Sequence, residues 1–144
     1  MNDKVFVDTN VLIYAHDVDA GDKHVVAVRI LKELWFSRLG VLSTQVLQEF
    51  YVNVTRKIPS PLSRSVARDI VGNYAAWQVE TVGPESILLA LESEERYQLS
   101  FWDALIVVTA QKGGAAKILS EDLNAGQTID SVLIENPFVT ALSS

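Results

Sequence analysis

The sequence contains no cysteine and only two histidines among its 144 residues. The lack of cysteine excludes disulfides, thiolate metal sites and thiol nucleophiles, and it agrees with a reducing compartment. No apolar run reaches membrane-spanning length, and the first residues lack the basic region and long apolar core of a secretion signal. We therefore expect a cytoplasmic protein with no membrane contact.

Basic residues are also in short supply, because 12 lysines and arginines face 18 aspartates and glutamates, for a formal charge of −6. A broad basic surface that grips nucleic acid through many phosphates is therefore not expected. Nucleic acid is not excluded, because acids gathered around a divalent cation are neutralised locally and the cation can meet a phosphate. Hydrophobic residues make up 49% of the chain, enough for one domain over residues 1–144.

Short apolar runs alternate with longer segments of helical periodicity along the chain. The short runs predict strands at residues 5–7, 41–44, 79–82 and 116–119, with an edge strand at 131–135. The longer segments predict helices at 10–15, 23–39, 45–57, 62–77, 84–98 and 101–111. Gly40 is expected to end the second helix. The buried stripe of the fifth helix is expected to consist of Ile87, Leu88, Leu91 and Tyr97. The alternation predicts a three-layer α/β/α sandwich with a mainly parallel central sheet.

Two aspartates follow predicted strands directly. Asp8 interrupts an apolar run at the end of the first strand, and Asp122 follows the strand at 116–119. Because the carboxyl ends of parallel strands meet at the edge where ligands bind, we expect the two carboxylates to lie near each other. Taken alone, Asp8 is explained equally well as a helix N-cap, and Ser120 could cap a short turn beside Asp122.

Two further acids lie in the early turns of predicted helices. Glu49 by itself fits a solvated surface acid, but its helix begins near the same sheet edge as Asp8. Asp103 starts a helix that is apolar on nearly all sides, where a charge is costly unless it is paired or metal-bound. Ser100 and Asp103 also have capping-box spacing, and the helix N-terminus is expected to lower the pKa of Asp103.

The chemistry of such an acid set is specific. Carboxylates with little histidine and no cysteine suit Mg²⁺ or Mn²⁺ rather than zinc. Clustered acids cannot all stay ionised without such a cation. A bound ion activates water and stabilises charge on the attacking and leaving oxygens during displacement at phosphorus. The four acids therefore predict metal-assisted phosphodiester hydrolysis.

The acids stand in four motifs that occur in order along the chain: residues 5–15 around Asp8-Thr9-Asn10, then Gln48-Glu49-Phe50, residues 101–106 around Asp103, and residues 119–123 around Ser120-Glu121-Asp122. Together they resemble the PIN-domain ribonucleases, in particular the VapC-like toxins of bacterial toxin–antitoxin pairs. The resemblance implies endonucleolytic cleavage of RNA, with Mg²⁺ or Mn²⁺ held by the catalytic acids Asp8, Glu49, Asp103 and Asp122. It also implies a homodimer and a small antitoxin protein whose segment enters the acidic groove.

The resemblance further assigns supporting roles to Thr9, Asn10 and Ser120, which would orient the acids or the waters of the metal. Whether Glu121 or Asp122 is the fourth ligand is open from the residues alone. The densest basic group could contact the RNA backbone, although a solvated helix face explains it more simply; its members are Arg56, Lys57, Arg64 and Arg68.

Two other readings of the sequence lead to different functions. One is a signalling receiver domain that is phosphorylated on its strand-end aspartate, although receiver domains carry paired acids where this chain has Asp8-Thr9-Asn10. The other is a catalytically silent PIN-like regulator that binds RNA without cleaving it. The intact set of acids argues against the second reading.

Overall fold

The computed structural model describes residues 3–142. Its six-stranded sheet has the order β3-β2-β1-β4-β6-β5. The strands are β1 (Val5–Val7), β2 (Gly40–Ser43), β3 (Gln78–Glu80), β4 (Lys117–Leu119), β5 (Thr128–Ile129) and β6 (Val132–Glu135). All neighbouring strands are parallel except β5 and β6, which pair antiparallel.

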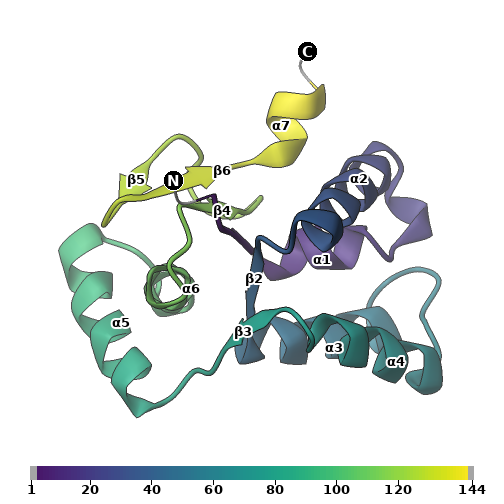
Figure 1. Ribbon diagram of the computed structural model, residues 1–144, viewed down its shortest axis with the longest axis horizontal. Helices are drawn as coiled ribbons and strands as arrows, with labels where there is room; N and C mark the ends of the chain where they lie inside the picture. Colours follow the sequence, from purple (N-terminus) through teal and green to yellow (C-terminus); the bar gives the residue numbers. More distant parts are fainter. Residues whose placement is uncertain (1–2, 143–144) are drawn as a thin grey trace.

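Helices cover both faces of this sheet (Figure 1). One side carries α1 (Thr9–Tyr14), α2 (Asp22–Ser37), α3 (Thr44–Arg56) and α4 (Arg64–Tyr74), and the other carries α5 (Pro84–Tyr97) and α6 (Phe101–Lys112). A 3-10 turn, η1 (Val18–Ala20), follows α1, and a short helix, α7 (Pro137–Leu142), follows β6 and packs beside α2. The predicted three-layer sandwich with a mainly parallel sheet is confirmed.

The register of the central strands brings two loops together. Val7 of β1 pairs with Leu119 of β4, and the backbone N–H of Asp8 donates to the Leu119 carbonyl at 2.9 Å. The residues that leave the carboxyl ends of β1 and β4 therefore start side by side. Strand β2 lies on the other side of β1, and α3 begins at its end.

The strand predicted at 131–135 exists as β6, but the prediction that it forms the edge is wrong. The chain reverses just before β6, where Asp130 and Ser131 have φ values of 49° and 71°, and β5 pairs on its outer side. Strand β5 has only two residues, too few to produce a recognisable alternation. The edges of the sheet are therefore β3 and β5.

The second helix ends earlier than predicted. Helix α2 stops at Ser37, and Arg38 adopts the left-handed conformation with φ 60°. Gly40 lies inside β2, where a Cβ atom would stand 2.2 Å from the Trp77 ring. The glycine there makes room for a ring from another segment, so its role could not be deduced from the helical pattern that precedes it.

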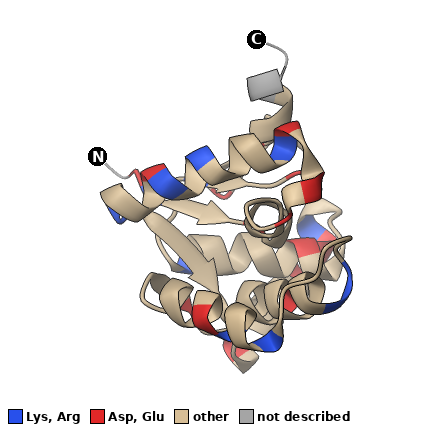
Figure 2. Ribbon diagram, turned by 90° about the vertical axis from the view of Figure 1, so that its right-hand side faces the viewer, with Lys and Arg blue, Asp and Glu red and all other residues tan. Residues whose placement is uncertain are grey.

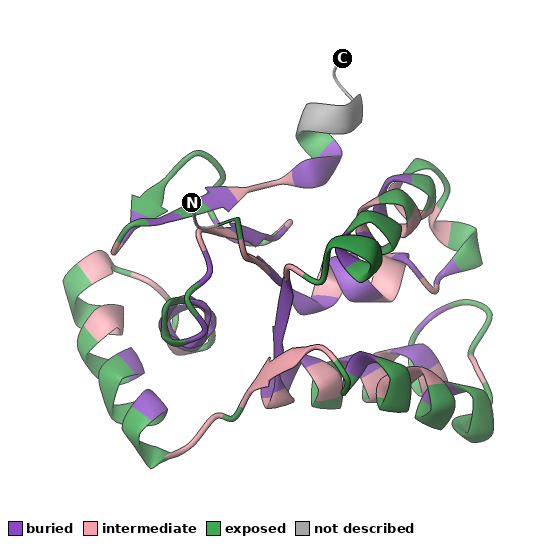
Figure 3. Ribbon diagram, in the orientation of Figure 1, coloured by how far each residue is buried: buried purple, intermediate pink, exposed green. Residues whose placement is uncertain are grey.

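The predicted buried stripe of α5 is wrong except for Tyr97, which is partly buried against the core. Ile87, Leu88 and Leu91 are exposed, and the buried residues of this helix are Ser86 and Ala90 (Figure 3). Helix α5 packs against α6, and the small side chains of Ser86 and Ala90 face that contact. The leucine-rich face of α5 is left in contact with solvent.

The strand order also decides between two of the functional readings. Receiver-type doubly wound domains have the strand order 2-1-3-4-5. This sheet instead runs 3-2-1-4 through its parallel core, so the receiver-domain alternative is wrong. Within residues 3–142, no helix combines the length and the apolar character needed to span a membrane.

Candidate active site

Asp8 lies at the carboxyl end of β1, with only 9% of its surface exposed. Its Oδ1 accepts a hydrogen bond from the backbone N–H of Thr9 at 2.7 Å, and its Oδ2 accepts one from the Ser120 hydroxyl at 2.7 Å. Asp8 is also the N-cap of α1. Capping and a place at the strand ends are therefore properties of the same carboxylate.

Burial raises the pKa of Asp8 to about 6 from its ordinary value of 3.8. The hydrogen bonds from Ser120 and Thr9 act in the opposite direction, and the negative charges of Asp122 and Glu49 raise the pKa further. A buried carboxylate surrounded by other acids gains most from a nearby cation.

Glu49 projects from the second turn of α3 and is held by two donors. The Thr9 hydroxyl donates to Oε2 at 3.0 Å, and the Gln45 amide nitrogen donates to Oε1 at 2.9 Å. Thr9 therefore links two acids, through its backbone to Asp8 and through its side chain to Glu49. The Oε1 atom of Gln45 is buried and has no hydrogen-bond partner in the described part of the chain, so this edge of the site holds a free acceptor.

Asp122 extends from the loop after β4 and is exposed. Its Oδ2 accepts from the Asn10 amide nitrogen at 3.0 Å, while Asn10 Oδ1 accepts the backbone N–H of Glu121 at 3.3 Å. Ser120 Oγ accepts the backbone N–H groups of Asp122 and Leu123 at 3.2 and 3.3 Å. Thr9, Asn10 and Ser120 thus each contact at least one of the four acids.

Asp103 lies in the first turn of α6, where its backbone N–H donates to the Ser100 hydroxyl at 3.1 Å. Burial raises the pKa of Asp103 despite a hydrogen bond with Ser100, and the charge of Asp122 adds to the rise. The expectation that the helix N-terminus lowers this pKa is therefore wrong. Helix α6 is buried from Ala104 to Ala110, and this apolar packing accounts for the loss of water around Asp103.

Asp122 is the electrostatic link between the acids, because its charge acts on both Asp8 and Asp103. No lysine or arginine within residues 3–142 forms an ion pair with any of the four. Nor do three acidic or histidine side chains in that range stand close enough to enclose one ion directly. The atoms that the four acids offer to a metal are all carboxylate oxygens whose charge is not paired with a lysine or arginine of residues 3–142. Mg²⁺ and Mn²⁺ prefer ligand atoms of this type.

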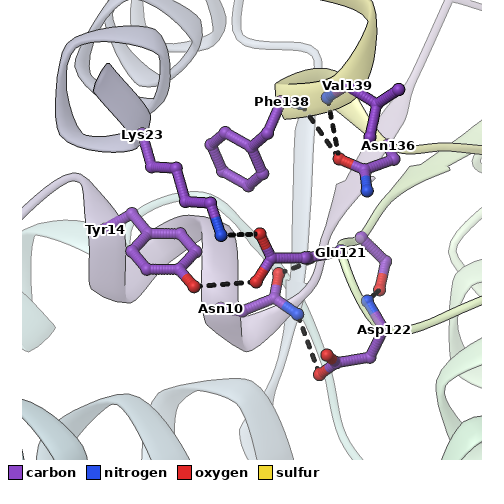
Figure 4. Close-up of polar contacts among 9 residues, drawn as sticks. Asn10, Tyr14, Lys23, Glu121, Asp122, Asn136, Phe138 and Val139 are labelled. Atoms are coloured by element: carbon purple, nitrogen blue, oxygen red, sulfur yellow. Dashed lines mark hydrogen bonds and ion pairs between the residues drawn. The ribbon is translucent and has the colours of Figure 1, made fainter. Parts of the chain in front are cut away.

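Glu121 points toward Tyr14 and Lys23, in a different direction from Asp122 (Figure 4). Its carboxylate accepts a hydrogen bond from the Tyr14 hydroxyl at 2.7 Å and pairs with Lys23 at 2.5 Å. This arrangement favours Asp122 over its neighbour as the fourth acid of the site. Sequence reasoning missed Tyr14, Lys23 and Gln45, and only Gln45 had a visible signal, its i−4 spacing from Glu49 on one helix.

The predicted RNA contacts lie on α3 and α4. Arg64 and Arg68 line a groove of about 330 Å³ with Tyr51 and Val71, and this lining includes none of the four acids. Arg56 and Lys57 are exposed at the C-terminal end of α3. Figure 2 shows Lys and Arg segments dispersed among Asp and Glu segments, with no continuous basic face in that view. Contacts of the four basic residues to RNA stay a prediction.

Solved structures that share this fold include the following two. VapC20 of Mycobacterium tuberculosis, a toxin that cleaves the sarcin–ricin loop, superposes with a TM-score of 0.62 at 22% identity, over 83% of this chain and 90% of VapC20. A toxin–antitoxin complex from Klebsiella pneumoniae has a TM-score of 0.67 at 18% identity, over 93% of this chain and 98% of that chain. A search of curated proteins found no match. Residues 5–128 match the model of the PIN domain, and the chain therefore belongs to the PIN-domain family.

Proposed function

We propose that this PIN domain is a Mg²⁺- or Mn²⁺-dependent endoribonuclease and the toxin of a type II toxin–antitoxin system. The observation that carries the proposal is the set of four acids around the carboxyl edge of the sheet. The carboxylates of Asp8, Glu49 and Asp122 accept hydrogen bonds from neutral donors, and none of the four acids is ion-paired with a lysine or arginine in residues 3–142. The fold shared with VapC20, which cleaves RNA, supports the reaction.

The ion would be held among Asp8, Glu49, Asp103 and Asp122, in part through its own bound waters, because no three of the described acids stand close enough to bind it directly. When bound, it supplies a water of lowered pKa and stabilises negative charge on phosphate oxygens. The residues around the acids aim them: Thr9 and Gln45 hold both oxygens of Glu49, and Ser120 holds Asp8. Because the pKa of Asp8 is about 6, this carboxylate is mostly ionised at neutral pH and available to a cation.

Replacement of an acid tests the reaction directly. Asp8→Asn and Asp103→Asn should each lower Mg²⁺-dependent cleavage of RNA by at least about 100-fold, because removing a ligand costs more than removing an outer partner. Cleavage is measured on total RNA with purified protein, and circular dichroism checks that the fold is intact.

Asp69→Asn is the matched control, since Asp69 is an exposed aspartate on α4. This variant should cleave at the wild-type rate. Undiminished cleavage by both Asp8→Asn and Asp103→Asn would refute the assignment, and a wild-type protein that binds RNA without cleaving it would favour the silent regulator.

The proposal includes an antitoxin, a small protein encoded beside this chain that binds it and closes the acidic edge. The fold shared with the Klebsiella toxin–antitoxin complex supports this partner. Co-expression of the neighbouring gene should yield a stable complex whose RNA cleavage is suppressed. Purification of this chain alone, together with normal growth on its expression, would count against the toxin role.

The proposal also includes a homodimer that acts in the cytoplasm, where its RNA substrate is. The leucine-rich face of α5 supports self-association, because Ile87, Leu88 and Leu91 would leave water in a dimer. The RNA sequence that is cut would be identified by transcriptome-wide mapping of new 5′ ends after induction.

A further inference from the structure

We propose that Tyr14, Lys23 and Glu121 form a positioning network that orients Asp122 toward Asp8 and Asp103 and thereby sets the affinity of the site for its divalent cation. The inference rests on the proposed function and deepens it. None of the three residues would touch the ion or the RNA. They act through the loop that follows β4, which also carries Ser120 (Figure 4).

At the centre of the network is the Glu121 carboxylate, and each of its two oxygens has a partner. The Tyr14 hydroxyl donates to Oε1 of Glu121 at 2.7 Å, and the Lys23 ammonium pairs with Oε2 at 2.5 Å. Tyr14 belongs to α1 and Lys23 to α2, so two helices grip the same side chain. The side chains of Lys23 and Glu121 are 40% and 24% exposed, so the ion pair is only partly shielded from water, and the hydrogen bond from Tyr14 adds to its hold on Glu121.

Aromatic packing holds the two donors in place. The Tyr14 ring meets Phe138 of α7 edge to face, with centroids 5.1 Å apart and planes at 87°. The Lys23 ammonium lies 5.1 Å from the Tyr14 centroid and 6.0 Å from the Phe138 centroid. Phe138 is buried, so the anchor of Glu121 is part of the packed interior. The Tyr14 ring is therefore held in a fixed position, and it keeps its hydrogen bond only while Glu121 stays in place.

Asn10 transmits this anchoring to Asp122. Its side-chain oxygen accepts the backbone N–H of Glu121 at 3.3 Å, which leaves its amide nitrogen facing the next residue, and that nitrogen donates to Asp122 Oδ2 at 3.0 Å. Asn10 and Tyr14 are four residues apart on α1 and therefore share a face of that helix. Two residues on one face of α1 thus bind the adjacent side chains of Glu121 and Asp122, which point in different directions.

The network has an electrostatic consequence as well as a geometric one. Glu121 is adjacent in sequence to Asp122. An unpaired charge on Glu121 would add a fifth carboxylate to a set in which Asp122 and Glu49 already raise the pKa of Asp8. The Lys23 ion pair neutralises that charge. Loss of Lys23 would therefore both loosen Asp122 and leave an unpaired carboxylate beside it that competes for the cation.

The test measures metal binding separately from cleavage, using the full chain. Mn²⁺ is titrated into the protein by isothermal calorimetry, and RNA cleavage is followed against Mg²⁺ concentration. Glu121→Ala and Tyr14→Phe should each raise the Mn²⁺ dissociation constant and the Mg²⁺ concentration for half-maximal cleavage by about 10-fold, the low end of the effect of outer partners. The cleavage rate at saturating Mg²⁺ should stay within about twofold of wild type, because all four acids remain.

Two controls separate positioning from general stability. Lys23→Arg should keep near-normal Mn²⁺ affinity because the cation remains, whereas Lys23→Met should weaken it. Glu135→Gln removes a carboxylate that pairs with Lys117 at 3.6 Å on neighbouring strands, and it should leave the Mn²⁺ affinity unchanged. Thermal unfolding in EDTA reports the stability of every variant.

The outcomes are distinguishable. Wild-type binding of Mn²⁺ combined with normal affinity in Glu121→Ala and Tyr14→Phe would overturn the inference and leave the proposed function intact. An affinity loss in Glu135→Gln as large as that in Glu121→Ala would also overturn it, because the effect would then be structural. A wild-type protein that neither binds Mn²⁺ nor cleaves RNA would overturn the proposed function and this inference together.

Discussion

At the scale of single residues, the site is organised by uncharged donors that hold charged acceptors. Ser120 and Thr9 hold Asp8, Gln45 and Thr9 hold Glu49, and Asn10 holds Asp122. Neutral donors aim a carboxylate without cancelling its charge, so the attraction for a cation is retained. Burial then makes the charge of Asp8 costly in the absence of a metal.

The raised pKa of Asp8 predicts how stability depends on pH. Between the ordinary pKa of 3.8 and the folded value of about 6, the folded protein binds a proton that the unfolded chain has released. The contribution of this group is therefore fully present below pH 3.8 and is lost as the pH rises through 6. The loss approaches about 3 kcal/mol, since each pKa unit corresponds to about 1.4 kcal/mol.

In Asp8→Asn the side chain at this position cannot ionise. We therefore expect the free energy of unfolding of this variant in EDTA, minus that of wild type, to rise by about 3 kcal/mol from pH 4 to pH 7. Above pH 7 the difference should level off. Urea unfolding of both proteins at five pH values measures the difference. A flat difference for Asp8→Asn would contradict the burial cost of this carboxylate.

At the scale of the elements, several helix starts follow from local chemistry. Ser43, Ser63 and Ser100 are N-caps whose hydroxyls accept a backbone N–H three residues on. Such caps are visible in a sequence because the interaction is local. The ends are less predictable, as the left-handed Arg38 at the end of α2 and the glycine inside β2 demonstrate.

Gly40 provides a test of this close packing. A Cβ atom at this position would lie 2.2 and 2.4 Å from two carbons of the Trp77 ring. Gly40→Ala should therefore lower the free energy of unfolding by about 1–3 kcal/mol, the usual cost of overpacking. Chemical denaturation followed by tryptophan fluorescence measures the change.

Gly72→Ala is the matched control, because Gly72 lies within α4 and a Cβ atom there meets nothing within 4 Å. This variant should gain about 0.5–1 kcal/mol from its better helix propensity. Equal stability of Gly40→Ala and wild type would mean that the Trp77 ring can move aside without cost.

At the scale of the whole molecule, the exposed face of α5 is the feature that the monomer leaves unexplained. Leu88 is 64% exposed and Leu91 48% exposed, while the same helix buries an alanine and a serine against α6. Burying the leucines against a second copy would remove apolar surface from water at about 25 cal/mol per Å². The face therefore favours the proposed homodimer.

Charge on this face should disrupt the dimer. Wild-type protein is expected to show the mass of a dimer in size-exclusion chromatography with light scattering, and Leu88→Glu combined with Leu91→Glu should show the mass of a monomer. Val66→Glu, at a 48% exposed position on α4, is the control and should stay dimeric. A monomeric wild type at micromolar concentration would contradict this assignment.

Much of the fold and most of the candidate site could be predicted from local patterns. Apolar runs identified the five longer strands, and the acids after β1 and β4 were expected together because parallel strands end at one edge. Thr9, Asn10 and Ser120 were expected beside them, and each contacts an acid. The strands and the two strand-end acids follow from neighbours in the chain and a general rule of sheet geometry, whereas the roles of Thr9, Asn10 and Ser120 were implied by the resemblance to PIN-domain ribonucleases.

Only the tertiary structure decided the remaining features, because each depends on residues far apart in the chain. Glu121 turns from the site because Tyr14, 107 residues away, and Lys23 bind it, and no local rule separates it from Asp122. The pKa of Asp103 rises because burial in the packed fold and the charge of Asp122 outweigh the hydrogen bond with Ser100, which is contrary to the lowering expected from the helix N-terminus. The sequence by itself determined which carboxylates are brought to the sheet edge, and packing determined where each one points and how much its charge costs.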